Sequence, residues 1–215
     1  MSGAPYPSNE VERIEALKEL DLLDSAPEAC FDGLVELACR FVQVPIALVS
    51  LIDTNRQWFK AKQGLEASQT CRSWAFCAWA ILENRPFVIP DSRKDARFSN
   101  GPLVVNDPHV IFYMGIPLYF PGTNICIGTL CAIDNKPRYP TQEQLHSMRL
   151  LANQAIALCV ERKMRKHSER SLNRFLSCMT HEVRTSVNHI LGTLQLLGTG
   201  FSKEHLMAFS QLKQS

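Results

Sequence analysis

The sequence contains no apolar run long enough to cross a membrane. Its longest apolar stretches, Val44–Ile52 and Ile125–Ile133, are about half the roughly 20 residues that a membrane-spanning helix needs. Met1–Glu10 is polar and contains proline, and no basic start leads into an apolar run, so a secretory signal is not expected. We therefore expect no membrane span and a cytoplasmic location.

An excess of charge of either sign is also missing. Lysine and arginine number 23 against 21 aspartates and glutamates, which gives a net charge of +2. A field this weak does not indicate nucleic acid or a membrane surface as a partner. One local basic run, Glu161–Arg174, has six basic and two acidic residues but no interleaved aromatics. We interpret it as an exposed connector helix, and no nucleic-acid partner is expected.

Cysteine is present, but not at a spacing that predicts a metal site. The eight cysteines are scattered and include no C-x-x-C pair, so free thiols are expected and a structural zinc is not. Cys126 and Cys131 lie on a strand-like segment, where their odd spacing predicts side chains on opposite faces. Cys71 and Cys77 flank a bulky segment and are a candidate redox pair, although small buried cysteines are the commoner outcome.

The composition otherwise suits a globular domain, with 46% hydrophobic and 20% charged residues. Hydrophobic periodicity predicts helices at Glu10–Leu23, Phe31–Val42 and Ala75–Glu83, and another that follows a capping box formed by Thr141 and Gln144. Strands are predicted at Ile46–Ile52, Gln57–Lys62, Phe87–Ile89, Val110–Leu118 and Ile125–Ile133. Pro90–Pro108 is predicted to be rich in loops. This order predicts an α+β fold.

Several short motifs occur in a fixed order within residues 14–159. They are LID before RQWF, then FCAWAI, PD, DARF, PLV, FYMGIPL and IGTLCAID. This set closely resembles a bacterial GAF domain. The resemblance implies an antiparallel sheet flanked by helices, with a pocket beneath the sheet that in relatives holds very different small molecules or none. We assign residues 1–13 to an N-terminal segment and residues 14–160 to a GAF sensor domain.

Three ligand signatures of such domains are missing, so the ligand stays open. No Cys-His dipeptide occurs, which removes the attachment site of bilin-binding relatives, and the cyclic-nucleotide signature of other GAF domains is not evident. The separation of Cys71 and Cys77 does not match the cysteine set of relatives that reduce methionine sulfoxide. A small-molecule ligand is expected, and its identity is unknown.

Five further residues attract attention within the GAF segment. Trp79 stands where relatives often carry a histidine, and we interpret it as a packed indole with a satisfied N–H rather than as a residue that fills the pocket. His109 could ligate haem or a metal, but a lone histidine is more often solvated or hydrogen-bonded. Asp91, Asp95 and Arg97 are interpreted as charges that fix loops rather than as a catalytic cluster.

Residues 175–192 read FLSCMTHEVRTSVNHILG and resemble the phospho-acceptor box of sensor histidine kinases. Apolar residues recur here at steps of three or four, which predicts a helix with one apolar face suited to a helical bundle. The face consists of Leu172, Leu176, Met179, Val183, Val187, Ile190, Leu194 and Leu197. His181 lies off this face and is expected to face solvent.

The resemblance implies that His181 is the phospho-acceptor. Only a neutral imidazole attacks phosphorus, and the adjacent Glu182 can act as general base by taking the ring proton as the N–P bond forms. Thr185 lies one turn further on, and in related kinases this position orients a water that removes phosphate from the receiver domain, so a phosphatase role is a hypothesis for Thr185. Ser186 replaces the proline that kinks this helix in most relatives. His189 is the competing acceptor but has no adjacent carboxylate.

The remaining segments are assigned as a connector helix at 161–171 and a partial dimerisation and phospho-acceptor domain at 172–215. The second helix of this hairpin is expected after Thr199–Ser202. No glycine-rich ATP-binding lobe and no G-x-x-x-x-G-K loop is found. ATP and magnesium would therefore bind to a catalytic domain absent from this chain, which should be inactive alone. The expected partners are a second copy in a homodimer, a kinase ATP-binding domain and a response-regulator receiver domain.

These features lead to one hypothesis and two alternatives. The chain is expected to be the sensing and phospho-accepting part of a two-component histidine kinase, autophosphorylated on His181 and passing phosphate to a response-regulator aspartate. The first alternative is a non-catalytic GAF ligand-binding regulator with a degenerate kinase segment. The second is a thiol redox enzyme built on the GAF core.

Overall fold

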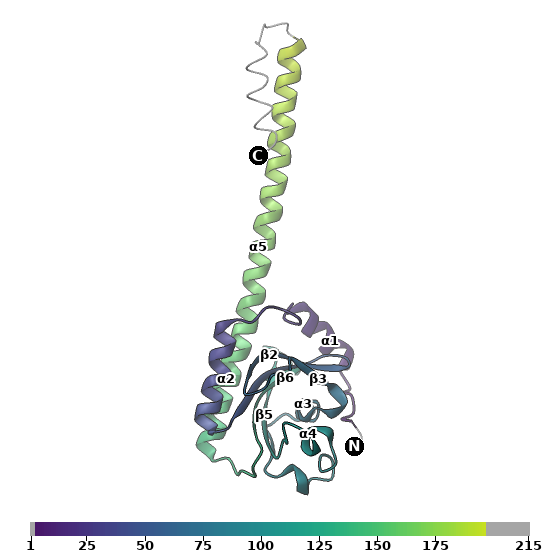
Figure 1. The fold of residues 1–215 in the computed structure, drawn as a ribbon. Coiled ribbons are helices and arrows are strands. Elements are labelled where there is room, and N and C mark those ends of the chain that lie inside the picture. Colours follow the sequence, from purple (N-terminus) through teal and green to yellow (C-terminus); the bar gives the residue numbers. More distant parts are fainter. Residues whose placement is uncertain (1–2, 197–215) are drawn as a thin grey trace. The chain divides into compact units, whose positions relative to one another are not determined.

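The computed structural model describes the backbone of residues 3–196 and the side chains of residues 3–193 (Figure 1). The chain divides into two units, residues 1–163 and residues 164–215. The first is called the GAF unit below. The helix expected after Thr199–Ser202 lies outside the described residues.

The helices and strands follow the predicted order. The helices are α1 (Glu10–Glu19), α2 (Ala29–Val42), α3 (Phe76–Ala80), α4 (Pro102–Val105) and α5 (Gln142–Leu196), with short 3-10 helices at Arg72–Trp74 and Ser92–Lys94. The strands are β1 (Ile46–Ile52), β2 (Arg56–Gln63), β3 (Gln69–Cys71), β4 (Phe87–Ile89), β5 (Phe112–Tyr119) and β6 (Cys126–Asp134). β3 and α4 were not predicted, because β3 is polar and largely exposed and α4 lies within the Pro90–Pro108 segment that was predicted to be rich in loops.

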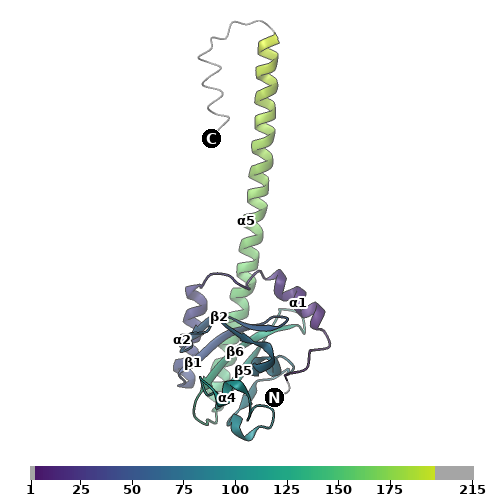
Figure 2. The same ribbon diagram turned by 45° about the vertical axis from the view of Figure 1, so that its right-hand side comes forward.

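The six strands form one sheet in the order β3-β2-β1-β6-β5-β4, and every neighbouring pair is antiparallel. The central strands β1 and β6 are buried at every residue, since both of their faces are covered. Helix α2 and the first turns of α5 lie side by side on one face of the sheet in both ribbon views (Figures 1 and 2). The predicted α+β fold with an antiparallel sheet is therefore confirmed for the GAF unit.

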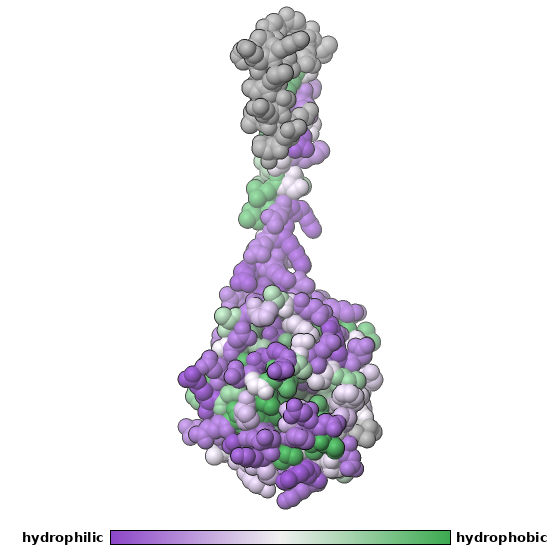
Figure 3. Space-filling model, in the orientation of Figure 1, coloured by the Kyte–Doolittle hydropathy of each residue, from purple (hydrophilic) through white to green (hydrophobic). Residues whose placement is uncertain are grey.

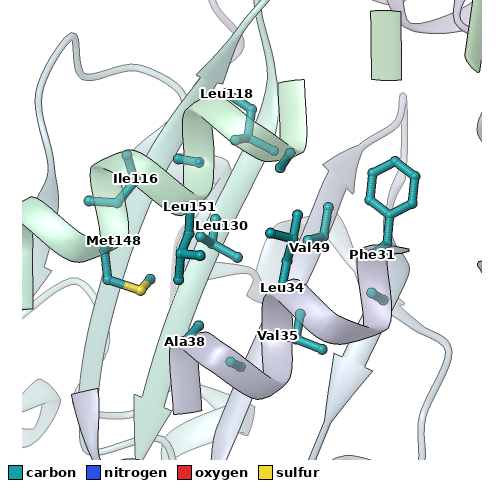
Figure 4. Packing of buried hydrophobic residues seen from close by; sticks show 14 of the residues in the cluster. Phe31, Leu34, Val35, Ala38, Val49, Ile116, Leu118, Leu130, Met148 and Leu151 are labelled. Atoms are coloured by element: carbon teal, nitrogen blue, oxygen red, sulfur yellow. The ribbon is translucent and has the colours of Figure 1, made fainter. Parts of the chain in front are cut away.

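Two hydrophobic clusters pack against the sheet, one on each face. The first lies between the sheet and the pair α2 and α5, where Leu34, Ala38, Leu130, Met148 and Leu151 meet (Figure 4). The second lies on the other face, where α3 and the segment before β5 pack on the sheet; it includes Phe76, Cys77, Phe98, Tyr113 and Cys131. The α3 side of the sheet therefore contains the chemically more varied side chains.

An irregular register at the start of β6 changes which way its cysteines point. Leu118 on β5 pairs with Gly128, but the next residue, Tyr119, pairs with Cys126, so Ile127 is an extra residue in the strand. Such a bulge shifts the alternation of side chains by one. Cys126 and Cys131 consequently both lie in the cluster on the α3 side. The expectation that they point to opposite faces was wrong.

Helix α1 ends earlier than its periodicity suggests. The predicted helix ran to Leu23, because Leu20 and Leu22 continue the apolar spacing and are indeed buried. The backbone, however, turns into the left-handed region at Asp21 (φ 51°) and again at Asp24 (φ 57°), which a helix cannot include. The predicted helix Ala75–Glu83 is likewise reduced to Phe76–Ala80.

The start of α5 confirms the predicted capping box. The backbone N–H of Gln144 donates to Thr141 Oγ1 at 3.2 Å, and the backbone N–H of Thr141 donates to Gln144 Oε1 at 3.0 Å.

Further along α5, Arg162 departs from the expected solvated helix, since it is only 9% exposed. Its guanidinium donates to Glu28 Oε1 at 2.7 Å and to the Asp21 carbonyl oxygen at 2.6 Å. The basic segment is thus anchored to the GAF unit at its beginning.

Glu10 joins two buried arginines at the start of α1. Its carboxylate accepts hydrogen bonds from Arg13, at 2.8 Å to each oxygen, and from Arg72. Arg13 also donates to the Ile52 carbonyl oxygen at the end of β1. Burial would raise the pKa of Glu10, but the two guanidinium groups outweigh burial and lower it to about 2. This cluster fastens α1 to the sheet.

We expect Glu10→Gln to destabilise the protein in a pH-dependent manner. Because the folded-state pKa lies below the unfolded value of about 4.3, the carboxylate stabilises the fold above about pH 4.3, and this contribution is lost as the pH falls towards 2. The variant should lose about 2 kcal/mol of unfolding free energy at pH 7 but only about 0.5 kcal/mol near pH 2.5, which is close to the folded-state pKa. Urea unfolding of both proteins at the two pH values measures this.

Glu12→Gln is the matched control, because Glu12 lies in the same first turn and is exposed. Its substitution should change the unfolding free energy by less than about 0.5 kcal/mol at either pH. Equal losses for Glu10→Gln at pH 7 and pH 2.5 would show that the carboxylate charge does not stabilise the fold.

Candidate functional site

A cavity of about 490 Å³ opens on the α3 side of the sheet. Its walls come from β1, β2, β3, β5 and β6, from α3 and α4, and from the segments that follow β2 and α4. The lining residues are Ile46, Leu48, Gln57, Phe59, Gly64, Leu65, Glu66, Ala67, Thr70, Phe76, Cys77, Leu103, Asp107, Pro108, Val110, Tyr113 and Ile133. Mostly apolar walls with a few polar groups suit a small organic molecule.

Cys77 provides the most reactive group of this cavity. It sits in the first turn of α3, and its sulfur accepts hydrogen bonds from Gln57 Nε2 at 3.2 Å and from the Tyr113 hydroxyl at 3.1 Å. Its Sγ lies 3.9 Å from the Sγ of Cys131 on β6. Burial alone would raise the pKa of Cys77, but the Cys131 thiol, the Tyr113 hydroxyl and two further hydroxyl groups close by outweigh burial and lower it to about 7.

The partners of Cys77 shift in the opposite direction. Burial and the neighbouring Cys77 sulfur raise the pKa of the Cys131 thiol well above its ordinary value. The pKa of the Tyr113 hydroxyl is also raised well above 10, chiefly by burial. Both groups therefore keep their protons at neutral pH and remain hydrogen-bond donors to a thiolate on Cys77.

Two hydroxyl groups complete this polar cluster. Ser50 on β1 and Thr129 on β6 lie directly opposite each other in the sheet and are fully buried. Among the described residues, neither hydroxyl has a hydrogen-bond partner of good geometry. Both help to lower the pKa of Cys77. Burying a hydroxyl donor without an acceptor costs free energy. A thiolate on Cys77 would provide both hydroxyls with an acceptor.

An aromatic group beside Cys77 closes one side of the cavity. Phe76 stacks on Phe98 with ring centroids 4.1 Å apart, and on Tyr113 at 5.2 Å. Trp79 meets Phe98 edge-on at 6.1 Å, which confirms that it is a packed indole. The expectation for its N–H was wrong, because Trp79 Nε1 is buried without a hydrogen-bond partner in the part of the chain that the structure describes.

The charged residues singled out from the sequence fix loops, as predicted. Arg93 pairs with Asp91 at 2.8 Å and Arg97 pairs with Asp95 at 2.7 Å. Each aspartate also accepts the backbone N–H of the residue two positions later. His109 is held through Nδ1 at 3.2 Å from the Val104 carbonyl oxygen.

The described residues contain no group of three metal-binding side chains. Cys71 is exposed, and its sulfur lies 3.1 Å from Ser73 Oγ. The sulfur that neighbours Cys77 belongs to Cys131, and the redox role considered for Cys71 and Cys77 stays a prediction.

The second unit carries the proposed phospho-acceptor residues on α5. His181, Glu182 and Thr185 are all exposed, and Thr185 Oγ1 donates to the His181 carbonyl oxygen at 2.9 Å. His189 is exposed as well, and Thr193 Oγ1 donates to its carbonyl oxygen at 2.8 Å. The two histidines therefore have the same local geometry. They differ in the residue that follows, which is a carboxylate only after His181.

Apolar side chains of α5 form an exposed row, of which Figure 3 shows part as a green patch. The row consists of Leu172, Leu176, Met179, Val183 and Ile190, with Phe175 beside it. Their exposed fractions run from 43% for Met179 to 60% for Phe175. Leucines and phenylalanines at helical spacing and this degree of exposure indicate a face that another helix covers.

No helix within residues 3–196 is long and apolar enough to cross a membrane.

Comparison with known proteins identifies the first unit. The model of the GAF domain family matches residues 26–157. A curated relative, the cyclic di-GMP phosphodiesterase PA2567 of Pseudomonas aeruginosa, is 39% identical over 144 residues, which are 67% of this chain. The chain spans only 24% of the length of that relative.

Solved structures share the fold at low sequence identity. The GAF domain of PixJ from Thermosynechococcus elongatus has a TM-score of 0.53 at 14% identity, over 79% of this chain and 98% of that one. A domain assigned to a two-component sensor histidine kinase protein of Sinorhizobium meliloti has a TM-score of 0.51 at 15% identity, over 68% and 99%. Free methionine-R-sulfoxide reductase of Neisseria meningitidis has a TM-score of 0.51 at 13% identity, over 77% and 99%. With a matching family model over more than half of its length, this chain belongs to the GAF domain family.

Proposed function

We propose that this chain is the sensing and phospho-accepting part of a two-component sensor histidine kinase. The observation that carries the proposal is an exposed histidine, His181, followed directly by a carboxylate on a helix with an exposed apolar row. The family match ends at residue 157, so the acceptor assignment rests on the sequence and helix of residues 172–193. The GAF unit supplies the sensory part.

The geometry of α5 suits phosphate transfer to an imidazole. An exposed ring can meet a donor phosphate held by another domain. As the ring nitrogen attacks phosphorus, the other ring nitrogen becomes acidic, and Glu182 is the nearest carboxylate in sequence that can take its proton. ATP and magnesium would be held by a separate catalytic domain. Thr185, one turn further on, is proposed to orient the water that hydrolyses the phosphate on the aspartate of the receiver domain.

The exposed apolar row supports a homodimer. Side chains such as Leu172, Leu176 and Val183 would be costly to leave in water. A second copy of α5 offers the same spacing, and a symmetric pair of helices would cover both rows. His181 lies off the row and would stay accessible in such a dimer.

The signal is proposed to be a small molecule in the GAF cavity. Its volume of about 490 Å³ and its apolar walls suit such a ligand. The same helix, α5, packs into the core of the GAF unit at Cys159 and carries His181. A ligand that shifts the packing of the first turns of α5 could therefore alter the acceptor helix.

A second candidate function is a GAF regulator of a different output domain. The relative with 39% identity favours it, because that protein is a cyclic di-GMP phosphodiesterase. In this case residues 172–196 would serve as a linker and dimer helix, and His181 would carry no phosphate.

Phosphorylation in the presence of a kinase ATP-binding domain separates the two candidates. The chain is mixed with catalytic domains of several sensor histidine kinases, magnesium and radiolabelled ATP. A phosphoryl-acceptor function predicts label on the chain that is lost in acid and stable in base, as expected for an N–P bond. Label that is stable in acid, or no label from any catalytic domain, would contradict the proposal.

A further inference from the structure

The cavity of the GAF unit contains two thiols that differ in access. Cys77 is among the residues that line the cavity, whereas Cys131, 3.9 Å away from sulfur to sulfur, is not among the described lining residues. We propose that Cys77 and Cys131 are a peroxide-reactive thiol pair, in which Cys77 reduces a small hydroperoxide that enters the cavity and Cys131 then forms a disulfide with it. This site is independent of the phospho-acceptor assignment.

The two sulfurs are already close enough for a disulfide to form with local movement. A disulfide joins sulfurs about 2 Å apart, so the present separation must shorten by roughly half. Cys77 lies near the start of the five-residue helix α3, and Cys131 lies on the buried central strand β6. Movement of α3 and rotation of both side chains can bring the sulfurs together without disturbing the sheet.

The surroundings of Cys77 favour a thiolate. Gln57 and Tyr113 donate to its sulfur at 3.2 and 3.1 Å. The buried hydroxyls of Ser50 and Thr129 have no hydrogen-bond partner among the described residues, and they help to lower the pKa of Cys77 to about 7. Two buried donors without acceptors are an independent sign that this site is built for a charged or newly formed group.

The reaction balances with a hydroperoxide as the oxidant. The Cys77 thiolate attacks the terminal oxygen, the O–O bond breaks, and the leaving alkoxide takes a proton from water, which gives a sulfenic acid on Cys77 and an alcohol. The Cys131 thiol then attacks the Cys77 sulfur, and hydroxide leaves and is protonated by the thiol proton to give water. Two thiols and one hydroperoxide thus become one disulfide, one alcohol and one water.

Cys126, Cys159 and Cys71 of the GAF unit do not share the surroundings of Cys77. Burial raises the pKa of Cys126 to about 11 and that of Cys159 to about 12, so both remain protonated and slow to react. Cys71 is exposed, and its sulfur neighbours a serine hydroxyl. The structure therefore predicts which two of the eight cysteines become linked.

Disulfide mapping of the wild-type chain tests the proposal. The reduced protein is treated with an equimolar amount of hydrogen peroxide, the free thiols are blocked, and linked peptides are identified by mass spectrometry. We expect one link, between Cys77 and Cys131. At pH 7 the Cys77 thiol should be lost faster than the buried thiols of Cys126 and Cys159, because the pKa of Cys77 is lowered whereas theirs are raised. A link between Cys71 and Cys77, or no link while exposed thiols oxidise, would overturn the proposal.

Two variants assign the separate steps. In Cys131→Ser the second step is blocked, so a sulfenic acid should accumulate on Cys77 and be trapped by dimedone. In Cys77→Ser neither product should form, whereas the matched control Cys126→Ser should form the disulfide at the wild-type rate. Trapping of dimedone on another cysteine in Cys131→Ser would contradict the assigned order, and this readout does not depend on whether Cys77→Ser folds.

Discussion

Replacing His181 by glutamine is expected to reduce acid-labile phosphate on the chain by at least about 100-fold, down to the background of the assay. The imidazole nitrogen is the nucleophile, and an amide cannot replace it. Glutamine keeps the side chain polar at an exposed helical position, so the fold and the apolar row of α5 should be unaffected. The measurement is radiolabel transferred from a complementing kinase catalytic domain.

His189→Gln is the matched control for this prediction. Both histidines are exposed on α5, and each has a threonine four residues later that donates to its carbonyl oxygen. Only His181 is followed by a carboxylate. His189→Gln should therefore retain wild-type labelling. Loss of label in His189→Gln, or full label in His181→Gln, would show that His181 is not the phospho-acceptor.

Gly128→Ala is expected to lower the unfolding free energy by about 3 kcal/mol. Gly128 lies on β6 opposite Leu51 of the neighbouring strand β1, and an added Cβ would collide with the Ser50 carbonyl oxygen. This contact is between two central, fully buried strands, so the backbone has little freedom to move aside. Because Ser50 and Thr129 face each other at this point, the variant should also disturb the hydroxyl groups near Cys77.

Urea unfolding measures this effect, with Gly33→Ala as the control. Gly33 is inside helix α2, and an added Cβ there has no heavy atom within 4 Å among the described residues. Alanine is the better helix former, so Gly33→Ala should stabilise the protein by about 0.5–1 kcal/mol. A loss of less than about 1 kcal/mol in Gly128→Ala would show that β1 and β6 can separate to admit a side chain.

The fold of the GAF unit could largely be predicted from the sequence, because its elements follow local patterns. The strand Ile46–Ile52 was predicted with its observed bounds, and the capping box of Thr141 and Gln144 places the start of α5. The end of α1 could not be predicted in this way. Leu20 and Leu22 are buried at helical spacing, but the chain leaves the helix at Asp21 through a backbone conformation that apolar spacing does not encode.

The candidate site was harder to predict, because it depends on contacts between distant segments. Cys77 and Cys131 are separated by 54 residues and meet only when α3 packs on β6. Strict alternation of side chains along β6 predicted opposite faces for Cys126 and Cys131. A bulge at Ile127 instead places both cysteines on the same face. Arg162 looked solvated within a basic run, but its charge is neutralised by Glu28 from a loop 134 residues away.

For the helix proposed to carry the phospho-acceptor, the sequence is more informative than the structure. Its residues carry a recognisable order around His181, and the structure adds that this residue is exposed and that the apolar row beside it is uncovered in one chain. Both observations fit a helix that meets other copies or other domains. The function of this segment therefore has to be tested by its chemistry.

The most direct test of the central claim is to locate the phosphoryl group. The labelled chain would be digested at neutral to alkaline pH, where a phosphohistidine survives, and the modified residue identified by mass spectrometry. The account predicts a single phosphoryl group on the imidazole of His181. A phosphoryl group on His189, on a serine or threonine, or on no residue of a chain exposed to active kinase catalytic domains would contradict it.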